Sequence, residues 1–325
     1  MTTLIVAVRR KPASWERERR RMSSMNITIT GATGFIGHRL VQALLQDGHS
    51  LHALVRKRSA GLPSSSVRFS EWRSTESGPP PESLATADAI VHLAGEPVAQ
   101  RWTPEVKQRI RASRVDGTRN LVSALAKQSR RPKVLVCASA IGYYGSRGDD
   151  ILTEASTPGR DFLAQVTVDW EQAAGKAEDL GIRVVMPRLG VVLGKDGGAL
   201  AKMLPPFRVG LGGRLASGQQ WMSWIHIDDV IGLIRFALAN SAVRGPLNTT
   251  APQPVTNANF TKDLAEALHR PAIFPVPGFA LKTLFGEMAE VILASQRVIP
   301  QAAKSAGFQF QYPELRLALA RLLSE

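Results

Sequence analysis

Apolar and polar positions follow two periods along the first part of the chain. A short β-rich run at 26–30 leads into a glycine turn, and apolar residues then recur at helical spacing over 40–45. Gly48 suits the position after a helix C-terminus, and a second apolar run covers 51–55. The order of strand, turn, helix and strand predicts a βαβ unit that begins at Met25.

The same two periods continue along the rest of the chain. They predict an α/β fold, with a Rossmann-type doubly wound parallel sheet and a smaller C-terminal substrate domain. The stretches 59–83 and 194–218 are rich in Ser, Pro and Gly and are predicted to be loops. Further predicted strands are 88–95, 134–139 and 182–193, and predicted helices are 104–126, 230–239, 259–269 and 285–293.

The turn after the first strand reads Gly31-Ala-Thr-Gly-Phe-Ile-Gly37. Gly31 permits the tight turn, Gly34 lets a pyrophosphate approach the backbone, and Gly37 lets the helix pack near the sheet. The helix N-terminus adds free N–H groups and the positive end of its dipole. Inside an ordered βαβ unit this pattern predicts a dinucleotide site. Its candidate residues are Gly31, Thr33, Gly34, Phe35, Ile36 and Gly37.

Cations follow the second predicted strand. An NAD-binding unit usually has an acidic residue here for the ribose 2′-hydroxyl, whereas this chain has Arg56-Lys57-Arg58. Cationic side chains suit a 2′-phosphate. The sequence therefore predicts NADP(H), with Arg56 and Lys57 as candidate ligands. A solvated charge cluster is the alternative.

Further segments carry a recognisable pattern. They are VHLAGEP at 91–97, GYYG at 142–145, DWE at 169–171, RLGVVLG at 188–194, WMSWIHIDD at 221–229, QRVIP at 296–300 and AGF at 306–308. Together with the glycine spacing G-x-x-G-x-x-G, they resemble the atypical epimerase family of the extended short-chain dehydrogenase/reductases. The resemblance covers the chain from about residue 25 to its end, including a family-specific C-terminal domain.

The resemblance implies further cofactor contacts. The small residues that end the strand at 88–95 are expected to line the cofactor, and Leu189 in the strand at 182–193 is expected near the nicotinamide. Loops such as 194–218 commonly form a substrate lid in extended reductases, where Arg208 and Arg214 could meet an anionic substrate. A plain surface role is the alternative for these two arginines. Arg114 could reach the cofactor or a substrate anion, and a solvated helix face is the alternative. The candidate cofactor ligands in these segments are Leu93, Ala94, Gly95, Glu96, Arg114 and Leu189.

Extended reductases normally use a Ser or Thr, a Tyr, and a Lys four residues after the Tyr. Here the Ser/Thr position falls on Ala140, one residue after Ser139. The family spacing places the Tyr–Lys pair near Phe162 and Val166, or Leu163 and Thr167, on the helix that includes Glu171, and no Tyr-x-x-x-Lys occurs in the chain. The usual mechanism therefore cannot be carried over. Tyr143 or Tyr144, with Ser139 or Glu96, could supply other acid–base chemistry. Unknown proton donors, or cofactor binding without turnover, are the alternatives. The candidate catalytic residues are Ser139, Tyr143 and Tyr144, and aromatic packing is the alternative for the two tyrosines.

The net charge of +14 adds nucleic-acid binding as a competing hypothesis. Seven cations and two acids lie within 1–24, and the remaining basic residues are dispersed. The single cysteine, Cys137, excludes an internal disulfide and is expected to be buried. No His or Cys accompanies His226 at metal-ligand spacing, so His226 is expected in the core and no metal is predicted.

We therefore expect an NADP(H)-binding epimerase or oxidoreductase with an unknown small-molecule substrate. A regulatory or scaffold protein that binds the cofactor without turnover is the alternative. No nucleic acid or membrane partner is expected, a homodimer is possible, and the expected location is cytoplasmic. The expected parts are a disordered or non-native extension at 1–24, an NAD(P)-binding Rossmann domain at 25–193 to which 222–250 returns, and a smaller substrate-covering domain at 194–325.

Overall fold

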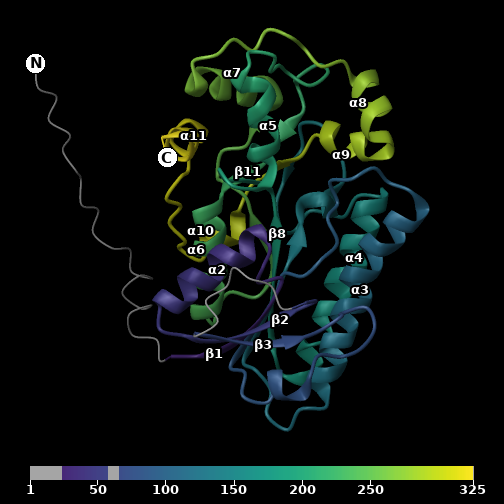
Figure 1. Cartoon of the computed structure of the whole chain (residues 1–325), viewed down its shortest axis with the longest axis vertical. Coiled ribbons are helices and arrows are strands. Elements are labelled where there is room, and N and C mark those ends of the chain that lie inside the picture. Colours follow the sequence, from purple (N-terminus) through teal and green to yellow (C-terminus); the bar gives the residue numbers. More distant parts are fainter. Residues whose placement is uncertain (1–23, 58–65, 325) are drawn as a thin grey trace, which may run out of the picture.

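The computed structural model describes residues 24–57 and 66–324. Helices lie on both sides of a central sheet, and a smaller lobe that contains α5, α7 and α8 lies above it in Figure 1. Within the described ranges, no helix is both long and apolar enough to cross a membrane.

The central sheet is parallel, and its strands run in the order β12-β8-β5-β4-β1-β2-β3, with β6 beside β8. The chain leaves β1 toward β2 on one side and reaches β4 on the other, which makes this the topological switch point. The sheet confirms the predicted fold class. Its strands are β1 Asn26–Thr30, β2 Ser50–Val55, β3 Val67–Glu71, β4 Ala89–His92, β5 Val134–Cys137, β6 Ser139–Ala140, β8 Arg183–Leu189 and β12 Gly245–Thr249.

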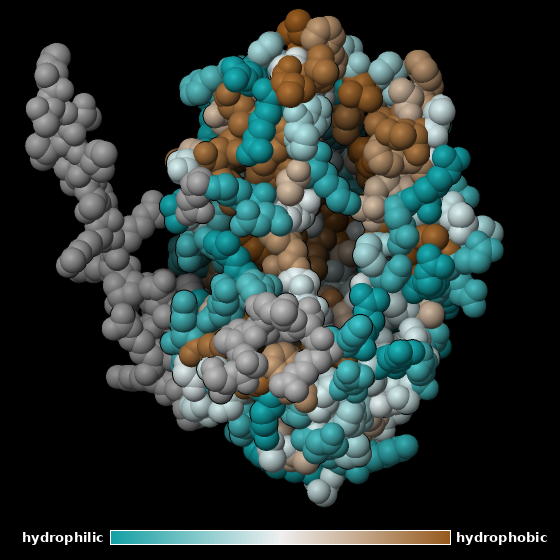
Figure 2. Space-filling model, viewed as in Figure 1, coloured by the Kyte–Doolittle hydropathy of each residue, from teal (hydrophilic) through white to brown (hydrophobic). Residues whose placement is uncertain are grey.

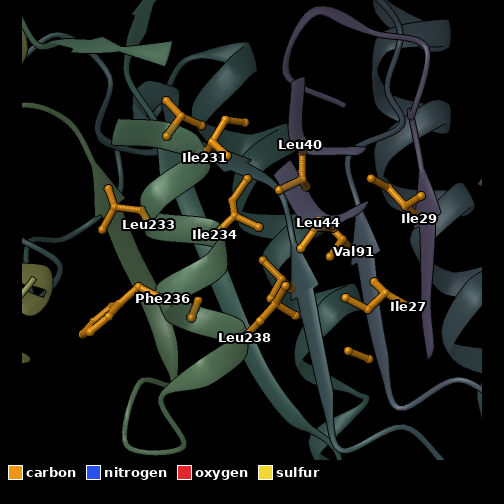
Figure 3. Packing of buried hydrophobic residues seen from close by; sticks show 14 of the residues in the cluster. Ile27, Ile29, Leu40, Leu44, Val91, Ile231, Leu233, Ile234, Phe236 and Leu238 are labelled. Carbon is orange, nitrogen blue, oxygen red and sulfur yellow. The ribbon is translucent and has the colours of Figure 1, made fainter. Parts of the chain in front are cut away.

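Two helix pairs cover the two faces of this sheet. Because side chains alternate along a strand, Ile27 and Ile29 face α2 (Phe35–Gln46) and α6 (Ile227–Ala239). In the view of Figure 3, the leucines of α2 lie between these two side chains and the isoleucines of α6, and all belong to one core cluster. On the opposite face, α3 (Pro104–Ala126) and α4 (Phe162–Gly175) form a second core with alternate residues of β2, β4, β5 and β8. Cys137 is fully buried in this second core, as predicted.

The upper lobe has its own core around Trp224 and Phe260. Its helices α5 (Gly198–Arg208), α7 (Asn257–Leu268) and α11 (Leu315–Leu323) contribute buried leucines to this core. The remaining helices are α8 Gly278–Phe285, α9 Ala289–Leu293 and α10 Gln301–Ser305, with single turns at Pro81–Ser83, Ile141–Tyr144, Glu178–Leu180 and Gly286–Met288. The short strands are β7 Ile151–Leu152, β9 Val191–Leu193, β10 Trp221–Met222, β11 Trp224–His226, β13 Val255–Thr256 and β14 Arg297–Val298.

The sequence-based loop predictions were wrong at two places. Strand β3 lies inside 59–83, where Val67-Arg-Phe-Ser-Glu71 pairs with β2 at the sheet edge, while 58–65 lies outside the described residues. Helix α5 lies inside 194–218 and contains both Pro205 and Pro206. It forms despite the prolines because it buries Leu200, Leu204 and Phe207 in the lobe core.

Two helix boundaries also differ from the prediction. The helix predicted over 285–293 is divided, because α8 ends at Phe285 and α9 begins at Ala289 after a single turn. Helix α6 begins earlier than predicted, at Ile227, and its N-cap is His226. The Nδ1 atom of His226 accepts the Asp228 N–H at 3.0 Å. His226 is buried and stacks on Tyr312, which confirms its predicted place in the core.

Candidate cofactor and active site

The glycine turn lies where β1 meets the segment that follows β4. Gly31 has a φ of +69°, and a Cβ there would lie 2.8 Å from the carbonyl carbon of Leu93. The Thr30 hydroxyl accepts the N–H groups of Leu93 and Ala94, each at 3.1 Å. A side chain at Gly31 would therefore separate two segments that this hydroxyl holds together.

Helix α2 begins directly after the turn with its N-terminus uncapped by any side chain. Its N-cap is Gly34, and no side-chain hydrogen bond is made there. A Cβ on Gly37 would lie only 2.0 Å from the Gly31 carbonyl oxygen, so the helix can approach the turn only with glycine at that position. Thr33 and Gly34 are exposed. The first-turn N–H groups, which include those of Phe35 and Ile36, are thus available to a phosphate.

The two predicted 2′-phosphate ligands follow β2 at the same edge of the sheet. Leu54 of β2 pairs with Thr30 of β1, so the chain leaves both strands at one level. Arg56 and Lys57 are exposed, and neither forms an ion pair with a carboxylate among the described residues. Arg58 lies outside the described residues.

Arg114 lies beneath the segment after β4 and holds its backbone. Its Nη1 atom donates to the Glu96 carbonyl at 3.0 Å, and a Cβ on Gly95 would lie 3.3 Å from the guanidinium carbon. The guanidinium also lies over the Trp170 ring at 5.3 Å. Burial lowers the pKa of Arg114 to about 10, and the Glu96 carboxylate opposes this shift. The structure thus brings together the predicted residues from Leu93 to Glu96 and Arg114.

A buried ion pair joins β8 to α4 behind the predicted catalytic residues. The Nε and Nη2 atoms of Arg188 each donate to a different carboxylate oxygen of Glu171 at 2.8 Å. The Arg188 side chain is 2% exposed and that of Glu171 is 10% exposed. Ser139, also buried, donates its hydroxyl proton to the same carboxylate at 2.5 Å. Such a bidentate pair fixes the orientation of both side chains.

The two adjacent tyrosines have different environments around Arg188. Tyr144 is fully buried, donates its hydroxyl to Asn248 at 2.6 Å and accepts from Arg188 at 2.8 Å. Burial raises the pKa of Tyr144 to about 12, although Arg188 opposes the shift. Tyr143 is only half-buried, and its ring centroid lies 3.5 Å from the Arg188 guanidinium carbon. Among the described residues, no group forms a hydrogen bond with the Tyr143 hydroxyl.

Sequence reasoning did not single out Glu171 and Arg188 as parts of the site. Both lie in segments that carried the family resemblance, at 169–171 and 188–194, but nothing in the sequence indicated that they pair. Leu189 ends β8 beside Arg188, where it pairs with Ala140 and Thr249.

Arg208 and Arg214, which were expected in a substrate lid, lie apart from the candidate cofactor and catalytic residues. Arg208 is exposed at the end of α5. Arg214 lines a cavity of about 840 Å³ with Lys262 and Arg270 of the lobe. None of the candidate cofactor or catalytic residues lines that cavity.

The candidate residues meet at the carboxyl ends of the parallel strands. In doubly wound sheets a ligand binds in the crevice at this edge, at the switch point. Figure 2 shows the molecule hollowed at its centre, between the lobe and the layers below it, with hydrophobic residues in the hollow. Residues 27–248 match the model of the NAD dependent epimerase/dehydratase family, and residues 276–322 match that of a domain of unknown function.

The chain belongs to the NAD-dependent epimerase/dehydratase family. This confirms the resemblance found in the sequence. Among curated relatives of this chain, the epimerase family protein SDR39U1 homolog, chloroplastic, of Arabidopsis thaliana is 44% identical over 93% of this chain and 87% of the relative. The epimerase family protein YfhF of Bacillus subtilis is 39% identical over 93% of this chain and 99% of its own length.

Solved structures of this family have the same fold. Human epimerase family protein SDR39U1 (isoform 2), crystallised with NADPH, matches with a TM-score of 0.83 and 35% identity, over 93% of this chain and 100% of that chain. A nucleoside-diphosphate sugar epimerase from Corynebacterium glutamicum matches with a TM-score of 0.75 and 37% identity, over 93% of this chain and 58% of that chain.

Proposed function

We propose that this protein binds NADP(H) at the Gly31–Gly37 turn. The uncapped N-terminus of α2 fits a pyrophosphate, because its free N–H groups have no side-chain partner. The exposed cations Arg56 and Lys57 fit a 2′-phosphate at the end of β2. The human relative crystallised with NADPH supports the same choice of cofactor.

We further propose that the protein is an oxidoreductase or epimerase that acts on a carbonyl or hydroxyl carbon of a small molecule. The bound cofactor would supply or accept the hydride at that carbon. The protein must then give a proton to the substrate oxygen, or take one from it, to balance the charge.

The Tyr143 hydroxyl is the group that we propose for this proton transfer. The observation that carries the proposal is the contrast between the two tyrosines. The hydroxyl of Tyr144 is buried and already bonded to Asn248 and Arg188, whereas that of Tyr143 has no partner among the described residues. A cation 3.5 Å from the Tyr143 ring would also stabilise the negative charge that develops on its oxygen as the proton leaves.

Ser139, Glu171 and Arg188 would then position Tyr143 rather than react. The Ser139 hydroxyl is committed to Glu171, and both carboxylate oxygens of Glu171 are committed to Arg188. This assignment differs from the expectation that Ser139 and Tyr144 react directly, and it leaves Tyr143 as the acid–base candidate.

The test is a turnover assay with matched variants. Purified protein is mixed with NADPH and a panel of carbonyl compounds and nucleotide sugars, with absorbance at the nicotinamide band for net reduction and product analysis for epimerisation. Tyr143→Phe should lose most turnover while it retains NADPH affinity. Tyr144→Phe is the control, and it should retain turnover to the extent that it folds. Full turnover in Tyr143→Phe would refute the acid–base assignment.

A protein that binds the cofactor without turnover is the second candidate. The observation that favours it is on α4, where Phe162, Leu163 and Val166 stand near the expected Tyr and Lys positions. The hydroxyl of Thr167 is also committed, since it donates to the Leu163 carbonyl at 2.7 Å. NADPH binding with no turnover on any member of the panel would favour this candidate.

A further inference from the structure

The Phe35 ring sits in a socket made by three glycines of the segment that leads into the lobe. A Cβ on Gly194 would lie 2.3 Å from the ring atom Cζ, and one on Gly197 would lie 2.4 Å from Cδ2. A Cβ on Gly198 would lie 2.9 Å from Cε1. Carbon atoms at van der Waals contact are about 3.5–4.0 Å apart, so the ring occupies the space that three side chains would need.

The socket belongs to the connection between the sheet domain and the lobe. Strand β9 ends at Leu193, and α5 begins at Gly198 with Gly197 as its N-cap. Leu193 and Gly198 also form a β-bridge, which closes the segment into a tight loop around the ring. Because α5 buries Leu200 and Leu204 in the lobe core, a shift of this loop would move the lobe helix with it.

Phe35 also belongs to the candidate cofactor site through its backbone. It is the first residue of α2, directly after the N-cap Gly34. Its N–H is therefore one of the first-turn groups that have no acceptor within the helix. One residue thus presents its backbone to the nucleotide and its ring to the lobe.

We propose that Phe35 is a positioning residue that couples nucleotide binding to the seating of the segment 194–208 of the lobe. The inference rests on the proposed NADP(H) binding. A pyrophosphate at the α2 N-terminus fixes the Phe35 backbone, and the ring then holds the loop from β9 to α5. Linkage between two binding or conformational events is reciprocal. The factor by which bound nucleotide favours the seated loop is therefore also the factor by which unseating the loop lowers nucleotide affinity.

Gly197→Ala tests the coupling with a single methyl group. Gly197 has a φ of −179°, which is an extended backbone that alanine adopts, so the main effect of the methyl is on the Phe35 ring. We expect NADPH affinity to fall by about tenfold, within the range of typical couplings. The double variant Gly197→Ala/Phe35→Leu has a smaller side chain in the socket and should recover affinity to within about threefold of the wild type.

Gly175→Ala is the matched control. Gly175 ends α4, and a Cβ there would meet no atom within 4 Å. It should therefore leave NADPH affinity unchanged. Wild-type affinity in Gly197→Ala, or a loss that Phe35→Leu does not reverse, would overturn the coupling.

Hydrogen exchange of 198–208 in the nucleotide-free protein separates this inference from the proposed function. Gly197→Ala should speed exchange in α5, and the added Phe35→Leu should slow it again. If the wild-type protein binds no NADPH, the proposed function and the coupling both fail, whereas unchanged exchange in Gly197→Ala overturns the ring contact itself. If Gly197→Ala does not fold, Gly194→Ala takes its place, since its Cβ would meet the opposite end of the same ring.

Discussion

Removal of the Glu171 carboxylate should be among the most destabilising single changes near the site. The Arg188 side chain is 2% exposed, and in Glu171→Ala it would keep its Tyr144 contact but lose both bonds from Nε and Nη2. A buried cation that has lost its partner costs about 3–5 kcal/mol. Urea unfolding, followed by circular dichroism, measures this loss as a lower transition midpoint with an unchanged slope.

Two further variants decide whether the loss has this cause. Arg188→Met in the Glu171→Ala background removes the unpaired cation, so it should recover part of the lost stability even though it deletes a second side chain's contacts. Glu76→Ala is the exposed control, because the Arg73–Glu76 pair is 70% and 63% exposed and should contribute less than about 1 kcal/mol. A Glu171→Ala protein as stable as the Glu76→Ala protein, or a double variant less stable than Glu171→Ala alone, would refute the reasoning.

Three other changes have expected outcomes. Arg56→Asp should weaken NADPH far more than NADH in a fluorescence titration, and an equal loss of both would contradict the 2′-phosphate assignment. Tyr144→Phe should cost about 1–3 kcal/mol in urea unfolding, because it leaves the buried Asn248 oxygen without its donor, and a neutral effect would contradict the burial argument. Burial raises the pKa of Asp229 from 3.8 to about 6, so the folded state binds the extra proton and stability should fall as pH rises between these values. The fall should be about 3 kcal/mol in the wild type and absent in Asp229→Asn, and matching pH profiles for the two proteins would show that Asp229 is not its source.

The sequence was sufficient for the cofactor turn because that structure is local. Gly31 and Gly37 meet within one turn. The apolar pattern on either side of that turn indicates the strand before it and the helix after it. The segment from Leu93 to Gly95 is distant in sequence from this turn, and it was placed beside the turn only through the family resemblance. Thr30 then holds it there through two hydrogen bonds that no sequence pattern indicated.

The missed elements depend on tertiary contacts. Strand β3 is a short edge strand whose flanking Ser, Pro and Gly residues give a stronger local signal than its own alternation. Helix α5 contains two prolines, and proline has a low intrinsic propensity for helix interiors. The burial of three of its side chains in the lobe core outweighs this low propensity. The pairing of Arg188 with Glu171 depends on how β8 and α4 pack, so it could not be derived from either segment alone.

The pairing of Arg188 with Glu171 bears on the absence of the Tyr and Lys motif. The same helix that should carry the motif carries Glu171, and its carboxylate holds Arg188 against the ring of Tyr143. A cation, Arg188, therefore still lies beside a tyrosine, Tyr143. It comes from β8 and not from the helix that should carry the motif, and it contacts the face of the tyrosine ring. Because an arginine stays charged at all accessible pH values, this arrangement would stabilise charge on Tyr143 without a titrating lysine. Turnover that persists in Tyr143→Phe would therefore point to another proton donor.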